Sequence, residues 1–428
     1  MTTRPNILLI CTDQQSASAM SCAGNVDLHT PGMDRLAAEG VRFSRAYCTQ
    51  PLCAPVRSSF VTGLMPSATG VTGNKVSMHE ELRERSLARL VGDAGYRCAL
   101  AGKWHVPGAT PQECGFEVIC DKDDSLIPQA SAHFLQGDQP FFLFASFTNP
   151  HDICQLARSQ QPPQGPIEAP PPVAECPNLP ANFQEPAYSP EMLRYSQRWN
   201  PSVYPTEDFS PDEWRRLRHG YFRLVEKVDA EVVRLLDALS ASGRERETLV
   251  LFMSDHGDGN GAHRWNQKTA FWEEVINIPV IARWPGVIDA GRVDERLVST
   301  GLDLLPTLCD VAGATAPDDL PGMSLRPLLH GDNTTQWRDE LVVETTSSIG
   351  EGPGGPAVGR ALVGERYKYS CYSMGRWREQ LVDLQADPGE MVNLAVERRH
   401  QELLSHCRRR LRARCDATGD VGGNMVPV

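Results

Sequence analysis

The stretch CAPVRSSFVTG, residues 53–63, places a cysteine, a proline and an arginine at alternate positions and closes on Thr-Gly. A thiol beside a guanidinium is compatible with a nucleophile, with a metal ligand, or with chance in a chain of thirteen cysteines. Cys53 and Arg57 therefore have to be weighed together with the other reactive stretches of the chain.

Four of those stretches each follow a short apolar run. The runs NILLIC (6–11), CALAG (98–102), FFLFASF (141–147) and LVLFMS (249–254) lead into TDQQ, KWH, TNPHD and DHGDGNGAH. Unbroken hydrophobicity over so few residues is typical of strands buried on both faces, as in a parallel sheet covered by helices. Ligands bind beyond the carboxyl ends of such strands, so we expect these Asp, Gln, Lys and His side chains to converge. Polar loops in general would give a more mixed set of residues.

Helical periodicity separates the apolar runs. Residues 33–40, 87–95 and 213–243 show it, and each segment ends in a glycine suited to a helix C-cap. The alternation of strands and helices predicts an α/β fold over residues 1–330, with a large, mostly parallel sheet flanked by helices. After about residue 330, short strand-like pieces and a last helical run predict a smaller antiparallel sheet with a helix on it, over residues 331–428.

The polar residues at two of the strand ends suit a divalent cation. Asp13 and Gln14 follow the first apolar run, and Asp255 and His256 follow the fourth. Carboxylates and an amide oxygen bind a hard cation, Ca²⁺ or Mg²⁺, better than zinc, which would attract the thiols. Calcium is therefore the expected ion.

Two segments are rich in proline or glycine. Residues 160–206 hold too many prolines for regular elements, and we expect a surface loop that is either part of the rim of the site or a bland excursion. Its aromatic side chains either stack on a substrate ring or pack down on the domain; they are Phe183, Tyr188, Tyr195, Trp199 and Tyr204. The stretch 347–359 reads as a loop within the smaller sheet.

Composition limits the partners. The 428 residues carry 42 basic and 54 acidic side chains, a net charge of −12, and the basic run RRHQELLSHCRRRLRAR near the end reads as the solvated face of a last amphipathic helix, so nucleic acid is not expected. Cysteines without paired spacing predict mostly reduced, buried thiols. The apolar run after Met1 is too short for a signal peptide or a membrane span, which favours the cytoplasm and no membrane partner.

Taken together, these blocks resemble the type I, formylglycine-dependent sulfatases of the alkaline phosphatase superfamily, in that family's order and over nearly the whole chain. The resemblance rests on RPNILLICTDQQ, CAPVRSSFVTG, GYRCALAGKWH, TNPHD, SDHGD, GAHRWNQKTAFWEEVINIPVIARWPG, RYKYS and LVDLQADPGEMVNL. It implies a mixed, mostly parallel, alkaline-phosphatase-like sheet and a hydrolase of sulfate esters.

The resemblance also gives Cys53 a role. In such sulfatases the signature cysteine is oxidised after synthesis to formylglycine, an aldehyde that hydrates to a geminal diol. One diol oxygen, held on the cation, would attack sulfur and displace the alcohol, and the second hydroxyl would then expel sulfate. Cys53 would thereby join Asp13, Gln14, Asp255 and His256 around Ca²⁺, with Mg²⁺ or Mn²⁺ as alternatives.

Further roles follow from the same resemblance. Lys103 and Lys268 are similar to the family's sulfate-binding lysines, which supply cations where negative charge accumulates. His105 would steady the diol. His151 would be the general acid near the leaving oxygen and would share sulfate contact with Lys268. His263 precedes Lys268 in a Gly-x-His and would contact the substrate.

Two positions depart from the common pattern of the family. Gln14 replaces a second aspartate, which keeps an oxygen ligand but removes one negative charge from the cation site. Val56 replaces a frequent serine, whereas Pro55 and Arg57 retain the signature that a sulfatase-maturing enzyme reads, and Arg57 would also hold the diol.

The predicted function is hydrolysis of a small-molecule or oligosaccharide sulfate ester, with a carbohydrate sulfate favoured by its frequency in the family. Two alternatives remain open: a phosphonate monoester or phosphodiester hydrolase of the same superfamily, and an unmatured, non-catalytic anion- or glycan-binding homologue. Hydrolysis that persists after Cys53→Ala would contradict the sulfatase mechanism.

Overall fold

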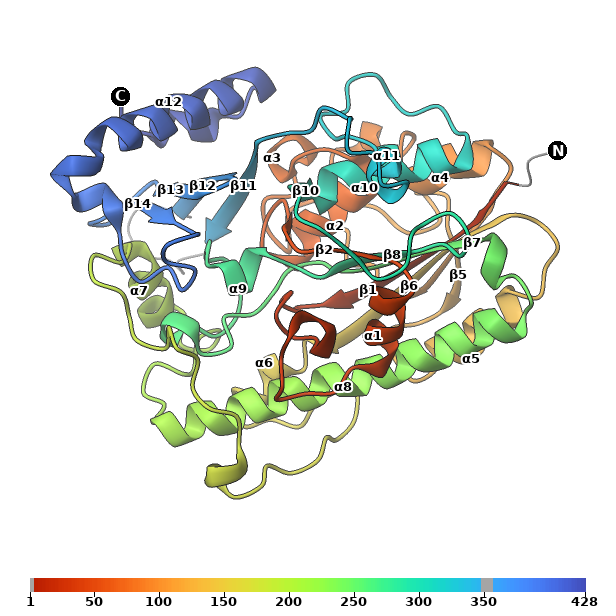
Figure 1. Ribbon diagram of the computed structural model, residues 1–428, viewed down its shortest axis with the longest axis horizontal. Coiled ribbons are helices and arrows are strands. Elements are labelled where there is room, and N and C mark those ends of the chain that lie inside the picture. Colours follow the sequence, from red (N-terminus) through yellow and green to blue (C-terminus); the bar gives the residue numbers. More distant parts are fainter. Residues whose placement is uncertain (1–3, 348–356) are drawn as a thin grey trace.

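The four apolar runs form the centre of an eight-stranded sheet in the computed structural model, which describes residues 4–347 and 357–428 (Figure 1). The strand order is β5-β4-β6-β1-β7-β8-β2-β9. The first five strands in this order, from β5 across to β7, run parallel to one another. Strand β8 is antiparallel to both of its neighbours, and β9 is parallel to β2. The predicted mixed, mostly parallel sheet is confirmed. The strands are β1 (Asn6–Asp13), β2 (Val41–Phe43), β4 (Arg97–Gly102), β5 (Glu117–Cys120), β6 (Phe141–Pro150), β7 (Thr248–Ser254), β8 (Val280–Arg283) and β9 (Arg292–Asp294).

Strand β1 shows why the runs are apolar throughout. Its side chains alternate between two cores, with Ile7 and Leu9 in the core on one face of the sheet and Leu8 and Ile10 in the core on the other. All four are buried, because helices cover both faces.

The helices form one layer on each face of the sheet (Figure 1). Helix α8 (Pro211–Ala241) spans one face and packs against β6, and it begins at a capping box in which Ser210 and Glu213 bond each other's backbone amides. With it lie α1 (Pro31–Ala38), α5 (Ile127–Phe134) and α6 (Ile153–Leu156). The other face carries α2 (Cys53–Thr62), α3 (Pro66–Thr69), α4 (Leu87–Asp93), α10 (Thr300–Ala312) and α11 (Arg326–Leu329).

The three predicted helices are present, but one predicted glycine cap is wrong. Gly95 and Gly243 follow α4 and α8 with left-handed φ angles of 91° and 73°. Helix α1 ends at Ala38, and the φ of Gly40 lies outside the left-handed region. A Cβ at Gly40 would lie 2.1 Å from the carbonyl oxygen of Ala282, so this glycine is needed for the close approach of β8.

The proline-rich segment 160–206 was predicted to contain no regular elements, and this prediction is wrong. It contains α7 (Glu191–Trp199) and a short 3₁₀ helix at Val173–Glu175. Pro190 stands at the N-cap of α7, where a proline costs no helical hydrogen bond, and Pro201 follows its end. Proline here marks the ends of a helix and does not exclude one.

The C-terminal part forms the predicted small antiparallel sheet with a helix packed on it. Strands β11 (Glu340–Ser347), β12 (Ala357–Gly364), β13 (Tyr367–Tyr372) and β14 (Glu379–Asp383) pair in that order, and α12 (Gln401–Thr418) buries Leu404 and Leu411 against them. Of the predicted loop 347–359, both ends belong to strands, and residues 348–356 lie outside the described residues.

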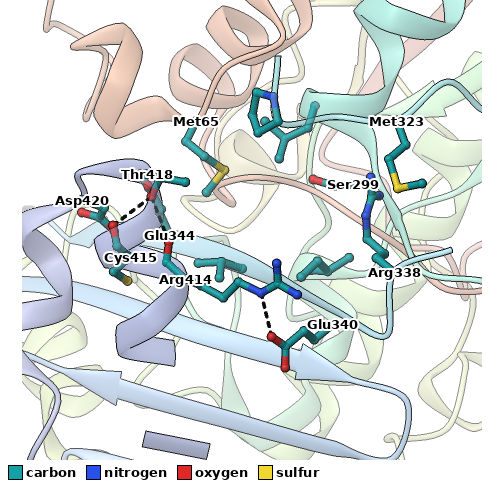
Figure 2. A pocket seen from close by; sticks show the side chains of 14 residues that line it. Met65, Ser299, Met323, Arg338, Glu340, Glu344, Arg414, Cys415, Thr418 and Asp420 are labelled. Atoms are coloured by element: carbon teal, nitrogen blue, oxygen red, sulfur yellow. Dashed lines mark hydrogen bonds and ion pairs between the residues drawn. The ribbon is translucent and has the colours of Figure 1, made fainter. Parts of the chain in front are cut away.

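The last helix is confirmed, and its basic run bonds acids of its own subdomain. Arg408 forms a bidentate pair with Glu379, at 2.6 and 2.7 Å. Arg414 reaches Glu340 at 2.7 Å beside a pocket of about 210 Å³, which β11 and α12 form together with Met65, Ser299 and Met323 (Figure 2).

Two further expectations concern cysteines and membranes. All thirteen cysteines are free thiols, and eleven of them are buried, as their spacing predicts. Within the described ranges 4–347 and 357–428, no helix is both long and apolar enough to cross a membrane. The strands and the α-helix not yet given are β3 (Ala46–Tyr47), β10 (Val298–Ser299) and α9 (Glu273–Ile276).

Candidate active site

Cys53 is the first residue of α2 and is buried at the carboxyl end of the parallel strands. Its sulfur lies 3.2 Å from Nε2 of His256 and 3.2 Å from Nζ of Lys268. The unpaired backbone amides at a helix N-terminus favour negative charge, so this position stabilises an anionic nucleophile.

Electrostatics around Cys53 reinforce that preference. Burial alone would raise the pKa of the thiol, but Lys268 and then Lys103 lower it well below its ordinary value. Two other buried cysteines beside the site, Cys11 and Cys154, keep raised pKa values because burial dominates there. Cys53 is thus set apart from its neighbours by its cations.

The predicted cation ligands come together because β1 and β7 are adjacent parallel strands. Thr12 pairs with Ser254, so the next residues, Asp13 and Asp255, leave the sheet side by side. Ligand atoms of Asp13, Cys53, Asp255 and His256 all lie within 4.8 Å of one another, and all four residues are buried.

Arg57 joins the two carboxylates of this cluster. Its Nε donates to Asp255 at 2.9 Å, and its Nη2 lies 3.5 Å from Asp13. Its Nη1 donates to Ser146 Oγ at 2.8 Å and to the carbonyl of Lys103 at 3.1 Å, which ties α2 to the ends of β6 and β4. Sequence reasoning did not single out Ser146.

The two predicted sulfate-binding lysines point into the same cluster from different segments. Lys103 follows β4 and forms an ion pair with Asp13. Lys268 lies in the segment after β7 and donates to Gln14 Oε1 at 2.9 Å. The pKa of Asp13 lies below its ordinary value. Burial and Cys53 raise this pKa, but nearby cations, of which Lys103 has the largest effect, lower it by more.

Two of the three remaining histidines also lie at the site. His105 lies close enough to Cys53 to help lower the pKa of the thiol, and its buried Nδ1 has no partner among the described residues. His151 is half-buried after β6 and lies close enough to Asp13 to lower the pKa of that carboxyl.

The structure does not bring His263 to this cluster, contrary to the predicted substrate contact. The imidazole is fully buried, stacks on Trp272 at 3.8 Å between ring centroids, and lies in a second cluster with Glu274 and Glu390. Burial, then Lys368 and Arg194, lower the pKa of His263 to about 3, so the ring is neutral. These contacts give His263 a structural role in packing the segment that carries Lys268.

Asp258 is a site residue that sequence reasoning missed. Its buried carboxylate accepts from Gln14 Nε2 at 2.7 Å and from the backbone amides of Gln267 at 2.9 Å and Asn260 at 2.7 Å. Asp258 therefore fixes Gln14 and the residue next to Lys268. Its place as the last residue of SDHGD was a signal that could have identified it.

The donor set fits a hard divalent cation. Three of the candidate ligands offer oxygen, namely Asp13, Gln14 and Asp255, and His256 offers a nitrogen. The Gln14 backbone amide donates to Asp255 Oδ1 at 3.0 Å, which holds both residues at the same edge of the sheet. Their burial with three surrounding cations makes the cluster a place for an anionic group and its counter-ion.

Fold and site together define a class: a hydrolase of α/β fold with a candidate nucleophile at a helix N-terminus, a candidate cation site and two lysines beside it. Residues 5–314 match the family described as Sulfatase, and residues 261–416 match the family described as N-sulphoglucosamine sulphohydrolase, C-terminal. The chain belongs to the sulfatase family and is a sulfuric ester hydrolase, which confirms the resemblance seen in the sequence.

Individual relatives support this assignment. The chain is 30% identical to the Delta 4,5-hexuronate-2-O-sulfatase of Bacteroides thetaiotaomicron, over 95% of this chain and 87% of that protein. It is 28% identical to the choline-sulfatase of Rhizobium meliloti, over 92% of this chain and 83% of that protein. The solved structure of a 2-O GAG sulfatase superposes with a TM-score of 0.87 at 29% identity, covering 97% of this chain and 93% of the other.

The phosphonate monoester hydrolase of Agrobacterium radiobacter shares the fold alone. Its TM-score is 0.76 at 23% identity, covering 96% of both chains.

The two matched family regions overlap between residues 261 and 314, so the division of the chain at residue 330 stays a prediction.

Proposed function

We propose that this sulfatase removes sulfate from a carbohydrate, using formylglycine made from Cys53 and a Ca²⁺ ion. The observation that supports this best is the position of Cys53, buried at the start of α2 with Lys268, His256 and Asp13 around its sulfur. Among its relatives, one is named a hexuronate 2-O-sulfatase and another, 29% identical, an ulvan-active sulfatase.

The residues around Cys53 divide the work of the reaction. A hydrated formylglycine would supply the nucleophile and the route by which sulfate leaves. Lys103 and Lys268 bind the sulfate oxygens and stabilise the charge that grows on them. His151, half-buried beside the site, protonates the leaving oxygen so that it departs as the alcohol, and His105, which lies near Cys53, orients the nucleophile.

Arg57 and Asp258 act through other residues. Arg57 holds Asp13 and Asp255 in place for the cation, and it offsets their mutual repulsion. Asp258 orients Gln14, so that a neutral oxygen completes a site with two carboxylates. With one charge fewer than a three-carboxylate site, the cation retains more positive potential toward an anionic substrate.

The signature has to be read before the chain folds. Pro55, Val56 and Arg57 are all buried within α2. A maturing enzyme of the kind the resemblance implies therefore acts on the unfolded segment, where Val56 is accessible in place of the frequent serine. This partner is part of the proposal.

Mass spectrometry and a substrate panel test the proposal together. The chain is produced with a sulfatase-maturing enzyme, and the peptide spanning Cys53 is weighed for conversion of the thiol to the aldehyde. The matured protein is then assayed on sulfated mono- and disaccharides, an aryl sulfate and a phosphonate monoester, with and without a chelator and added Ca²⁺. Cys53→Ala is the matched control.

We expect the aldehyde, release of sulfate from saccharides, loss of activity with chelator and its recovery with Ca²⁺. A persistent thiol, or equal activity in Cys53→Ala, would contradict the nucleophile. Faster cleavage of the phosphonate than of every sulfate would favour the alternative hydrolase, and activity confined to aryl sulfates would contradict the carbohydrate substrate.

A further inference from the structure

An exposed aromatic pair lies where the segment before α7 meets the turn between β13 and β14. Tyr188 is 50% exposed and Trp377 is 44% exposed, and their rings meet edge to face with centroids 4.9 Å apart. Both residues have left-handed φ angles, 59° and 50°, which non-glycine residues adopt at a cost. The chain therefore holds two rings at the surface against local backbone preference.

Arginines surround this pair. The exposed guanidinium of Arg376 lies 5.7 Å from the centre of the Trp377 ring and makes no ion pair or hydrogen bond with any residue that the structure describes. Arg198 on α7 is 67% exposed and lies 3.8 Å from the carboxylate of Glu207, so among the described residues Arg376 carries the unpaired charge of this surface. Tyr195 lies near these groups, since Glu191 raises the pKa of its hydroxyl while Arg198 and Arg376 oppose that shift. We call Tyr188, Tyr195, Arg198, Arg376 and Trp377 the aromatic–arginine patch.

The patch is held rigid by backbone contacts between its segments. The Glu191 amide donates to the Arg376 carbonyl at 3.1 Å, and the Arg376 amide donates to the Glu191 carboxylate at 2.8 Å. Asn393 Nδ2 donates to the carbonyl of Tyr188 at 3.1 Å. Groups fixed before a ligand arrives lose less entropy when it binds.

The same helix connects the patch to the active site. Arg194 donates to the carbonyl of His263 at 3.0 Å, and Gln197 donates to the carbonyl of Arg264 at 3.1 Å, in the segment that carries Lys268. Figure 1 shows α7 next to β14, with α9 and the strands of the large sheet beyond it. Helix α7 thus lies between the Lys268 segment and the turn that carries Trp377.

We propose that the aromatic–arginine patch binds further sugar residues of an anionic oligosaccharide whose sulfate ester lies at Cys53. Aromatic rings pack against the C–H faces of sugar rings, and guanidinium groups form paired hydrogen bonds with sulfate and carboxylate groups. In a protein of net charge −12, an exposed cluster with an unpaired arginine selects an anionic ligand by charge. The proposal rests on the carbohydrate substrate proposed above, and it makes that substrate an oligomer.

The first test compares chain lengths. The double variant Tyr188→Ala/Trp377→Ala, the variant Arg376→Ala and the control Arg409→Ala are matured and assayed on a sulfated, uronate-containing tetrasaccharide and on the monosaccharide that carries the same sulfate ester. Arg409 is an exposed arginine on α12 that is not one of the five residues of the patch.

For the aromatic double variant we expect kcat/KM on the tetrasaccharide to fall by roughly ten-fold, which corresponds to about 1.4 kcal/mol. On the monosaccharide the change should stay within about two-fold, and Arg409→Ala should match the wild type on both. Equal losses on both substrates, or no loss on either, would overturn the patch.

A second test separates this proposal from the one on which it rests. Binding of the same tetrasaccharide to the Cys53→Ala protein is measured by calorimetry, with and without the patch substitutions, and a neutral tetrasaccharide serves as the control ligand. Weaker binding in the patch variants supports the patch even if the enzyme cleaves only aryl sulfates. Binding that is undetectable, unchanged by the substitutions, or equal for the neutral ligand overturns it.

Discussion

The buried carboxylate of Asp258 offers a sharp test of how the site is positioned. Three N–H donors converge on its two oxygens, from Gln14 at 2.7 Å, Gln267 at 2.9 Å and Asn260 at 2.7 Å. Asp258→Asn keeps the shape of the side chain but exchanges one acceptor for an amide donor, so at least one N–H faces another donor. A hydrogen bond to a charged group contributes about 1.5–3 kcal/mol.

The cost cannot be relieved without disturbing the nucleophile. In the wild-type structure, the ammonium of Lys268 donates to Gln14 Oε1 at 2.9 Å. If Gln14 rotates its amide to accept from the new Asn, its NH₂ group faces that ammonium instead of the oxygen. We therefore expect the free energy of unfolding to fall by about 2–3 kcal/mol. We also expect kcat/KM to fall by roughly 10- to 100-fold, since each ten-fold corresponds to about 1.4 kcal/mol.

Both quantities are measured on matured protein, by denaturant titration and by sulfate release. The matched control is Asp208→Asn, which makes the same change at an exposed carboxylate in the segment before α8. A variant whose unfolding and kcat/KM both equal those of the control would refute the positioning role of Asp258.

Three further predictions concern charge. Lys268→Met should lower kcat/KM by at least about 100-fold. The same substitution should raise the pKa of the unmatured Cys53 thiol, which is measured from thiolate absorbance with Cys53→Ala as the blank. An unchanged pKa of Cys53 would contradict the contact between Lys268 and the thiol. The unfolded chain binds more protons than the folded one between the folded pKa of His263, about 3, and the ordinary value near 6.5, so stability should fall as pH drops through this window. His263→Gln should flatten that slope, by up to about 1.4 kcal/mol per pH unit, in denaturation between about pH 4 and 7. Glu379→Gln, which weakens the bidentate pair with Arg408, should lower the free energy of unfolding by roughly 1 kcal/mol and leave kcat/KM unchanged, whereas a change in activity would show that α12 acts on the site.

The sheet and most of the site could be predicted because they leave marks in the sequence. A strand between two helical layers must be apolar at every position, and the runs ending at Asp13, Lys103, His151 and Asp255 meet that demand. Parallel pairing then brings their carboxyl ends to one edge of the sheet. The meeting of these strand-end residues follows from this geometry, whereas the predicted sulfate-binding roles of Lys103 and Lys268 rest on the family resemblance.

Other features could not be read from the chain because they depend on tertiary contacts. The nine residues of α7 have an amphipathic pattern of their own, but they stand between Pro190 and Pro201 in a proline-rich stretch, which is why the segment was predicted as a loop. His263 lies five residues before Lys268, yet a left-handed turn at its own position, φ 53°, directs it into the second cluster beside Trp272. Spacing alone cannot show such a reversal in a residue that is not glycine.

The strained segment that carries Lys268 explains why the proline-rich region is needed. Several of its non-glycine residues have positive φ angles, and each such position costs of order 1–3 kcal/mol unless the surroundings impose it; they are Asn260, His263, Arg264, Gln267 and Thr269. The imposing contacts come largely from residues 182–206, where Tyr204 bonds the hydroxyl of Thr269 at 2.7 Å and Thr206 bonds Asn266 at 2.5 Å. The C-terminal sheet adds a bond from Thr345 to the carbonyl of Thr269 at 2.8 Å. The segment 182–206 therefore supports the segment that carries Lys268, and we expect substitutions in residues 182–206 also to shift the ammonium that lies 3.2 Å from the Cys53 sulfur.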